Sequence, residues 1–278
     1  MQLSQIELLP FGPDHIDGAF ALSQQAGWPH RREDWAMVLS LSQGFVALEE
    51  GRVAGTAMAT LYGSTCATVN MVIVDATMRG RGLGRKLMDL ALGAAEGREC
   101  RLVATTDGLP LYEKLGFAVV GEVVQHQGII KAPELQPANI AWADRGVLAE
   151  VRALDTQAFG ADRSALFERL FGQGKLAVLR DGERIVGCVA LRAFGRGEVV
   201  GPVVAATLED AKALLSFVFA ERTGHFLRVD TLVDTGLAPW LTEHGLLHVG
   251  GGLPMRRNVA ETAPSTMKTY ALASQALG

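Results

Sequence analysis

The chain has 278 residues, enough for about two domains of ordinary size. Apolar residues make up 49% of it and charged residues 20%, which supports a hydrophobic core and excludes a disordered chain. Its 26 basic and 30 acidic residues give a net charge of −4, without the basic footprint of a general nucleic-acid binder. We therefore expect a globular protein with no nucleic-acid partner.

The cysteines and the first twenty residues indicate the compartment. Cys66, Cys100 and Cys188 are odd in number and widely spaced, which predicts neither a disulfide framework nor a Cys-x-x-Cys metal site. Residues 1–20 lack the basic stretch and apolar stretch of a signal peptide. The best apolar run, Ala213–Ala220, is too short to span a bilayer. We expect a cytoplasmic protein with no membrane partner.

The hydrophobic pattern predicts a mixture of strands and helices. In chain order we expect a strand (Gln5–Leu9), two helices (about Asp14–Ala26 and Arg31–Leu41), a hairpin and third strand (Phe45–Val74), a helix (Leu83–Ala94), a strand (Arg101–Thr105), a short helix (Leu109–Leu115) and a closing strand pair after Phe117. After a proline-rich linker come two further helices, near Arg145–Ala158 and Ser164–Phe171.

Three features recur about 130 residues apart, which indicates an internal duplication. They are a hairpin with a glycine in its second arm, an apolar strand that runs into a helix, and a short helix closed by glycine. The paired positions are Gly55 and Gly187, Val74 and Val204, and Gly116 and Gly245. We predict tandem α/β units with mixed sheets, a first copy at residues 1–130, a linker at 131–137 and a second copy at 138–278.

The sequence Arg79-Gly80-Arg81-Gly82-Leu83-Gly84 follows a predicted strand and opens a helix. Glycines let the backbone approach a ligand closely, and a helix N-terminus offers unpaired N–H groups and partial positive charge. The segment lacks the Gly-Lys-Ser/Thr end of a P-loop and the Gly-x-Gly-x-x-Gly spacing of a dinucleotide-binding turn. It predicts a pyrophosphate site of another kind.

Two motifs carry a resemblance to the GCN5-related N-acetyltransferase (GNAT) family. Arg79-x-x-Gly82-x-Gly84 matches the family's Arg/Gln-x-x-Gly-x-Gly/Ala motif, and Leu111–Phe117 resembles its Leu-Tyr-x-Lys-x-Gly-Phe segment. The match covers about Gln5–Gln125. The second copy resembles the degenerate acetyltransferase-like domain that follows the catalytic one in a bacterial subgroup, with cues at Phe159–Ser164 and Gly201–Ala205.

The resemblance implies an acetyl-CoA-dependent N-acetyltransferase whose first copy is catalytic and whose acceptor is the amine of a small molecule. It implies Tyr112 as the general acid for the CoA thiolate and the amide of Val74 as the oxyanion donor. The implied CoA-binding residues are Val72, Ile73 and Val74 for the pantetheine arm, Arg79, Gly80, Arg81, Gly82, Leu83, Gly84 and Arg85 for the pyrophosphate, and Thr105, Gly108 and Leu111 nearby. Thr105 stands where the family often has Asn.

The second copy lacks these features, so one CoA per chain is expected. Glu209 and Asp210 stand where the first copy has arginines, and Leu241 stands at the position of Tyr112. Acidic residues at a helix N-terminus cap it and repel a pyrophosphate. We expect the second copy to form a wall of the acceptor site.

The acceptor site and general base are less defined. Trp28 and His30 lie in a segment that shapes the acceptor pocket in the resembled family, and Asp230 could hold an acceptor ammonium. Candidate bases are Asp75, His30, Glu33, Asp34 and His126, or a chain of water molecules. Histidines without metal-ligand spacing predict no metal. Two alternatives remain: a non-catalytic acyl-CoA-binding sensor or interaction module, and a nucleotide-binding α/β protein. The sequence does not indicate an oligomeric state.

Overall fold

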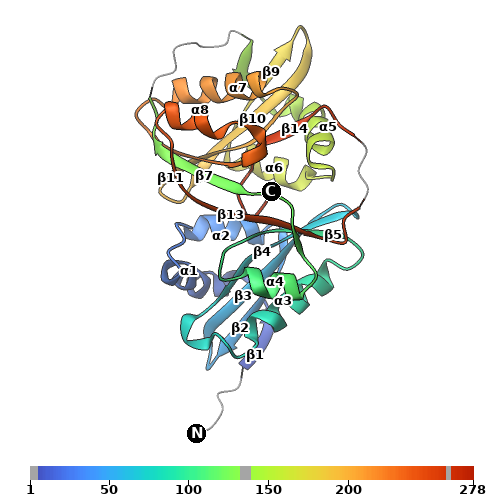
Figure 1. The fold of residues 1–278 in the computed structure, drawn as a ribbon, viewed down its shortest axis with the longest axis vertical. Helices are drawn as coiled ribbons and strands as arrows, with labels where there is room; N and C mark the ends of the chain where they lie inside the picture. Colours follow the sequence, from blue (N-terminus) through green and yellow to red (C-terminus); the bar gives the residue numbers. More distant parts are fainter. Residues whose placement is uncertain (1–5, 132–138, 261–263) are drawn as a thin grey trace.

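The computed structural model describes residues 6–131, 139–260 and 264–278. One mixed sheet of 14 strands runs through the molecule, with the order β1-β2-β3-β4-β5-β13-β7-β12-β11-β10-β9-β8. The two remaining strands lie off this path, where β6 pairs with β13 and β14 pairs with β11. Figure 1 shows two lobes, one from each copy, with β7 and β13 crossing between them. The sheet therefore passes from one copy to the other without a break.

Most predicted elements are present, with ends shifted by a few residues. The strands are β1 (Ile6–Pro10), β2 (Ser42–Glu49), β3 (Arg52–Tyr62), β4 (Cys66–Val74), β5 (Glu99–Ala104), β6 (Ala118–Val119), β7 (Val123–Ile129), β8 (Ile140–Trp142), β9 (Gly174–Asp181), β10 (Arg184–Phe194), β11 (Gly197–Ala205), β12 (Phe226–Leu232), β13 (Leu247–Arg257) and β14 (Lys268–Ala271). The α-helices are α1 (Ile16–Gln25), α2 (Arg32–Leu39), α3 (Leu83–Ala94), α4 (Leu109–Lys114), α5 (Leu148–Phe159), α6 (Ser164–Gln173), α7 (Leu208–Glu221) and α8 (Ala238–Glu243). Single 3₁₀ turns are η1 (Pro13–His15), η2 (Ala76–Met78), η3 (Arg145–Val147) and η4 (Val233–Thr235).

Helix α3 forms at the predicted residues and packs on the sheet of the first copy. Its buried stripe is Leu83, Leu87, Met88 and Ala91. Leu90 and Ala94, at helical spacing from Leu83 and Leu87, are only half-buried, and Met88 takes a core position instead.

The duplication is visible in the irregularities of the two copies. Strand β4 carries an extra residue against β3 between Asn70 and Ile73, and β11 carries one against β10 between Val200 and Val203. A bulge inserts one unpaired residue and bends its strand. Because these bulges also lie about 130 residues apart, they confirm the internal repeat.

The strands after Phe117 do not form the expected pair. Strand β7 pairs with β12 and β13 of the second copy, and β6 pairs only with β13. Strand β13 in turn pairs with β5 of the first copy through Leu253–Arg257. Pairing is set by contacts distant in the chain, so local pattern could not reveal this exchange. Each copy thus receives a strand from the other.

The copies also share a hydrophobic core. One cluster of buried side chains joins Trp35 and Tyr62 of the first copy to Leu166 and Phe167 of the second. The Tyr62 hydroxyl donates to the carbonyl of Leu277 at 2.8 Å. The predicted linker lies outside the described residues except for Lys131, and the division at 1–130 and 138–278 stays a prediction. Within the described ranges, no helix is long and apolar enough to cross a membrane.

Candidate active site

Strands β4 and β5 separate at the centre of the first copy. They pair in parallel only where Cys66–Thr68 meets Glu99–Arg101. The N–H of Asp75 donates to the carbonyl of Ala54 in β3 at 2.9 Å. Since N–H groups alternate between the two edges of a strand, the N–H of Val74 points the other way, into the opening beside β5. The opening therefore offers an unpaired backbone edge to a ligand.

The glycine loop leads from this opening into α3. Gly80 and Gly82 have φ angles of +77° and +76°, which glycine adopts without steric cost. A Cβ at either position would meet no described atom within 4 Å. The loop is therefore held open by backbone conformation, and the space beside it is free for a ligand.

The arginines of the loop form surface ion pairs. Arg79 pairs with Asp107 at 3.2 Å, and Arg85 pairs with Asp89 at 2.9 Å. Arg81 lies 3.9 Å from a carboxylate oxygen of Glu49. Exposed pairs of this kind contribute little to stability, so the arginines can turn toward an anionic ligand at small cost.

Tyr112 lies on α4, where its side chain borders the opening. The residue is 7% exposed, and its ring packs against Phe117 with the centroids 6.3 Å apart. Gly108 lies directly beneath the ring. Burial raises the pKa of Tyr112 to about 12, so the hydroxyl stays protonated at neutral pH. The described residues include no hydrogen-bond partner for it, which leaves a proton donor facing the cavity.

A cavity of about 790 Å³ joins this opening to the second copy. Both copies line it. The lining residues are Phe20, Gln24, Gly27, Trp28, Pro29, His30, Arg31, Val69, Asn70, Met71, Val72, Leu102, Val103, Thr105, Tyr112, Gln125, Gln127, Phe194, Arg196, Arg228, Val249, Gly251, Ser274, Gln275 and Ala276. Trp28, His30, Val72, Thr105 and Tyr112 were predicted as site residues, and the fold brings them to one space.

His30 is the one candidate base that lines this cavity. Its ring lies 5.3 Å from that of Phe194, and its Nδ1 is buried without a partner among the described atoms. Burial, and after it the charge of Arg228, lower the pKa of His30 to about 4. His30 is therefore neutral at pH 7, and the same lowered pKa makes its ring a weak proton acceptor.

The other candidate bases are engaged elsewhere and do not line the cavity. Hydrogen bonds from Thr77 and Arg52 lower the pKa of Asp75 to about 2. Asp34 is held by the Arg31 side chain and by the Gly195 N–H. Glu33 borders a different cavity, and His126 is buried on β7 beside His248.

Asp230, which we expected to hold an acceptor ammonium, does not line the cavity. It is fully buried on β12, accepts hydrogen bonds from Nε and Nη2 of Arg228 at 2.9 and 3.1 Å, and accepts one from Gln275. The carboxylate is already neutralised, so it is not free for an acceptor ammonium. Arg228 lines the cavity in its place.

The comparisons with known proteins agree with this geometry. Residues 6–117 match the family model "Acetyltransferase (GNAT) family", and residues 151–271 match "Acetyltransferase (GNAT) domain". The chain belongs to the GNAT family. It is an acyltransferase built from two GNAT units in tandem, as the motifs predicted.

Individual relatives cover nearly the whole chain. It is 28% identical over 284 residues to the uncharacterized N-acetyltransferase YitH of Bacillus subtilis, covering 98% of both chains. A candidate acetyltransferase from Pyrococcus horikoshii has a TM-score of 0.85 at 18% identity and covers 100% of this chain and 98% of its own. A tandem GNAT protein from the clavulanic acid biosynthesis pathway has a TM-score of 0.62 at 14% identity, with 94% and 100% covered. These structures show the shared two-unit fold.

The second GNAT unit has its own strand β14 where the first has an open edge. Strand β14 pairs with β11 at Val203, Val204 and Ala205, and its Tyr270 carbonyl accepts from Thr231 on β12. Val203 and Val204 lie about 130 residues after Ile73 and Val74. The corresponding helix start is capped internally, because Thr207 accepts from the Asp210 N–H at 3.1 Å. The N-cap of α7 is thus Thr207, and the acidic residues Glu209 and Asp210 lie in the first turn of the helix.

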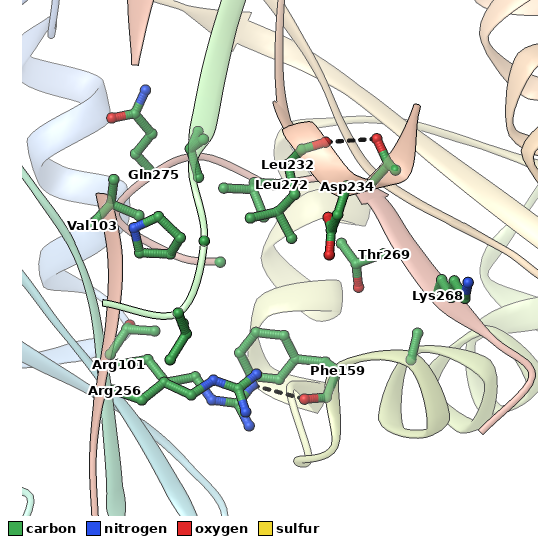
Figure 2. A pocket seen from close by; sticks show the side chains of 18 of the residues that line it. Arg101, Val103, Phe159, Leu232, Asp234, Arg256, Lys268, Thr269, Leu272 and Gln275 are labelled. Carbon is green, nitrogen blue, oxygen red and sulfur yellow. Dashed lines mark hydrogen bonds between the residues drawn. The ribbon is translucent and has the colours of Figure 1, made fainter. Parts of the chain in front are cut away.

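A second cavity, of about 550 Å³, lies between β14 and the strands of the first unit. Figure 2 shows Arg101 and Arg256 on one side of it, with Leu232, Asp234, Thr269 and Lys268 on the other. Leu241, at the position of Tyr112, is fully buried in the core of the second unit. The second unit therefore has no hydroxyl at the position that Tyr112 occupies in the first. The described residues contain no group of three or more metal-ligating side chains.

Sequence reasoning missed the residues that the second unit contributes to the first cavity. Arg228 and Asp230 lie two residues apart on β12, so both side chains are on the same face of the strand, and this spacing could have indicated the ion pair. Arg196 and Ser274–Ala276 carry no local motif. Their place depends on how the two units pack.

Proposed function

We propose that this acyltransferase moves the acetyl group of acetyl-CoA directly to the amine of a small molecule, with the chemistry in the first unit. The observation that carries the proposal is one cavity shared by Tyr112, the open edge of β4 and residues of the second unit. Clefts between domains are favoured sites for small molecules. The cavity has room for an acceptor beside the opening where the thioester would lie.

The glycine loop and β4 suit the two parts of CoA. Backbone N–H groups from Arg79 to Gly84, at the start of α3, would bind the pyrophosphate, with Arg85 adding charge. The free edge at Val72–Val74 would pair with the amides of the pantetheine arm. Thr105 lines the cavity near this path, and Leu111 packs against Gly84 where α4 meets α3.

The second unit is proposed to bind no CoA. Its matching strand edge is occupied by β14, and the first turn of α7 is closed by Thr207 and Asp210. A pantetheine arm would have to displace β14 to reach Val203 and Val204. One acetyl-CoA per chain follows from this difference.

In the reaction, the neutral amine attacks the thioester carbonyl carbon, and a C–N bond forms. The Val74 N–H, aimed into the opening, would stabilise the negative charge on the carbonyl oxygen. As the C–S bond breaks, the electron pair stays on sulfur and the Tyr112 hydroxyl supplies its proton. His30 or water takes the proton released by the nitrogen.

The experiment follows CoA thiol release with purified protein, acetyl-CoA and a panel of primary amines. We expect release that depends on an amine, with the N-acetylated product found by mass spectrometry. Thiol release at the same rate with and without every amine would refute the proposed function.

A further inference from the structure

The cavity has an unusual charge balance for a site that receives an amine. Arg31, Arg196 and Arg228 line it, whereas no Asp or Glu does. Asp34 and Asp230 are hydrogen-bonded to the lining residues Arg31, Arg228 and Gln275, and they do not line the cavity themselves. An acceptor that carried only positive charge would find no carboxylate there.

Arg228 is held in place with part of its guanidinium unused. The residue is 8% exposed, Nε and Nη2 bind Asp230, and the guanidinium carbon lies 5.0 Å from the centre of the Phe194 ring. No described residue accepts a hydrogen bond from Nη1. An arginine fixed in this way loses little conformational entropy when it binds an anion.

Positive charge also exceeds negative charge around Arg228. Asp34 serves both Arg31, at 2.9 Å, and the buried Arg192, at 3.8 Å. Arg196 is exposed, lies 5.4 Å from the Phe226 ring centre and forms no ion pair with any described residue. Four arginines therefore face two buried carboxylates in this region, and the surplus favours an anionic ligand.

We propose that the acceptor is an amine that also carries an anionic group, in the simplest case a carboxylate, and that Arg228 and Arg196 bind this group. The amine then lies toward Tyr112 and His30, in the part of the cavity lined by the first unit. The inference rests on the proposed function and names the substrate class of the same site. It replaces the expectation that Asp230 holds an acceptor ammonium.

The test compares matched pairs of amines with the full chain and acetyl-CoA. Each L-amino acid is paired with its carboxamide and with the amine formed by its decarboxylation, and phosphoethanolamine is paired with ethanolamine. We expect kcat/KM for the best anionic member to exceed that of its neutral partners about tenfold or more, because charge-assisted hydrogen bonds are the stronger kind. The phosphate pair separates a carboxylate site from a general anion site.

Variants locate the effect. Arg196→Gln removes an exposed side chain, and Arg228→Lys keeps a cation beside Asp230 while removing the guanidinium fork. Both should lower kcat/KM for the anionic acceptor about tenfold and leave that of its neutral partner within about twofold. Arg184→Gln, an exposed arginine of β10 outside the cavity lining, is the control and should change neither.

Acetyl transfer that is equal or faster to the neutral members overturns the inference and leaves the proposed function standing. So does an equal loss for both members of a pair in Arg196→Gln. No transfer to any amine counts against the proposed function, and the inference falls with it.

Discussion

Replacing Tyr112 by Phe removes one oxygen atom from the proposed proton donor. The ring contacts with Gly108 and Phe117 remain, and no described hydrogen bond is lost, so we expect stability to change by less than about 0.5 kcal/mol. General acids contribute about 10²- to 10⁴-fold in rate, or roughly 3–5 kcal/mol. Because burial raises the pKa of Tyr112 to about 12, it is a weaker acid than a free phenol, which favours the lower part of this range.

The assay is kcat at saturating acetyl-CoA and amine, with acetyl-CoA affinity measured separately by calorimetry. We expect kcat to fall about 10²-fold while affinity changes little. Tyr270→Phe is the matched control. It removes the same hydroxyl group from a tyrosine that lines the second cavity, of about 550 Å³, and it should leave kcat unchanged. A Tyr112→Phe enzyme with the wild-type kcat would refute the assignment.

Three further predictions test the CoA site and the cavity. Gly82→Ala should weaken acetyl-CoA binding about tenfold or more, because the added Cβ occupies the space proposed for the ligand. The control is Gly97→Ala, which has a similar φ of +77° and equally open surroundings and should cost only about 1–2 kcal/mol of stability. Equal acetyl-CoA affinities of the two variants would show that the glycine loop does not bind CoA. Calorimetry should find one acetyl-CoA per chain, and a second equivalent would contradict the role given to β14. The pKa of His30 falls from 6.5 to about 4 on folding, so the unfolded chain binds more protons between these values and stability declines as the pH is lowered through them. In urea denaturation, the free energy of unfolding of the wild type should fall about 2 kcal/mol more than that of His30→Gln between pH 7 and pH 5. An equal fall in both proteins would show that His30 is not desolvated.

The sequence was most informative where structure depends on neighbouring residues. Periodicity predicted α3 at Leu83–Ala94, and the offset of about 130 residues predicted the repeat that the bulges of β4 and β11 confirm. The glycine pattern located a loop with positive φ angles at Gly80 and Gly82. Each of these signals lies within one element or one turn.

Features that depend on contacts between distant residues could not be predicted in this way. The two units have similar strands, so the pattern of Val123–Ile129 fits either sheet, and nothing local indicates that β7 joins β12. Asp230 was singled out as a carboxylate that follows a predicted strand, whereas it lies within β12 and is bonded to Arg228 of the same strand. The second unit was predicted to form a wall of the proposed acceptor cavity. Which of its side chains line that cavity could be seen only once the packing of the two units was known.

The exchange of β7 and β13 has a consequence for how such a protein can change over time. A chain shortened after the first repeat would lose the neighbour of β5, exposing a row of unpaired backbone groups prone to aggregation. The second repeat thus covers a strand edge of the first, whatever chemistry it performs. If the second unit binds no CoA, as proposed, Arg196, Arg228 and the rest of its cavity surface are free to vary, and such changes would alter the choice of acceptor without disturbing the proposed site of acyl transfer.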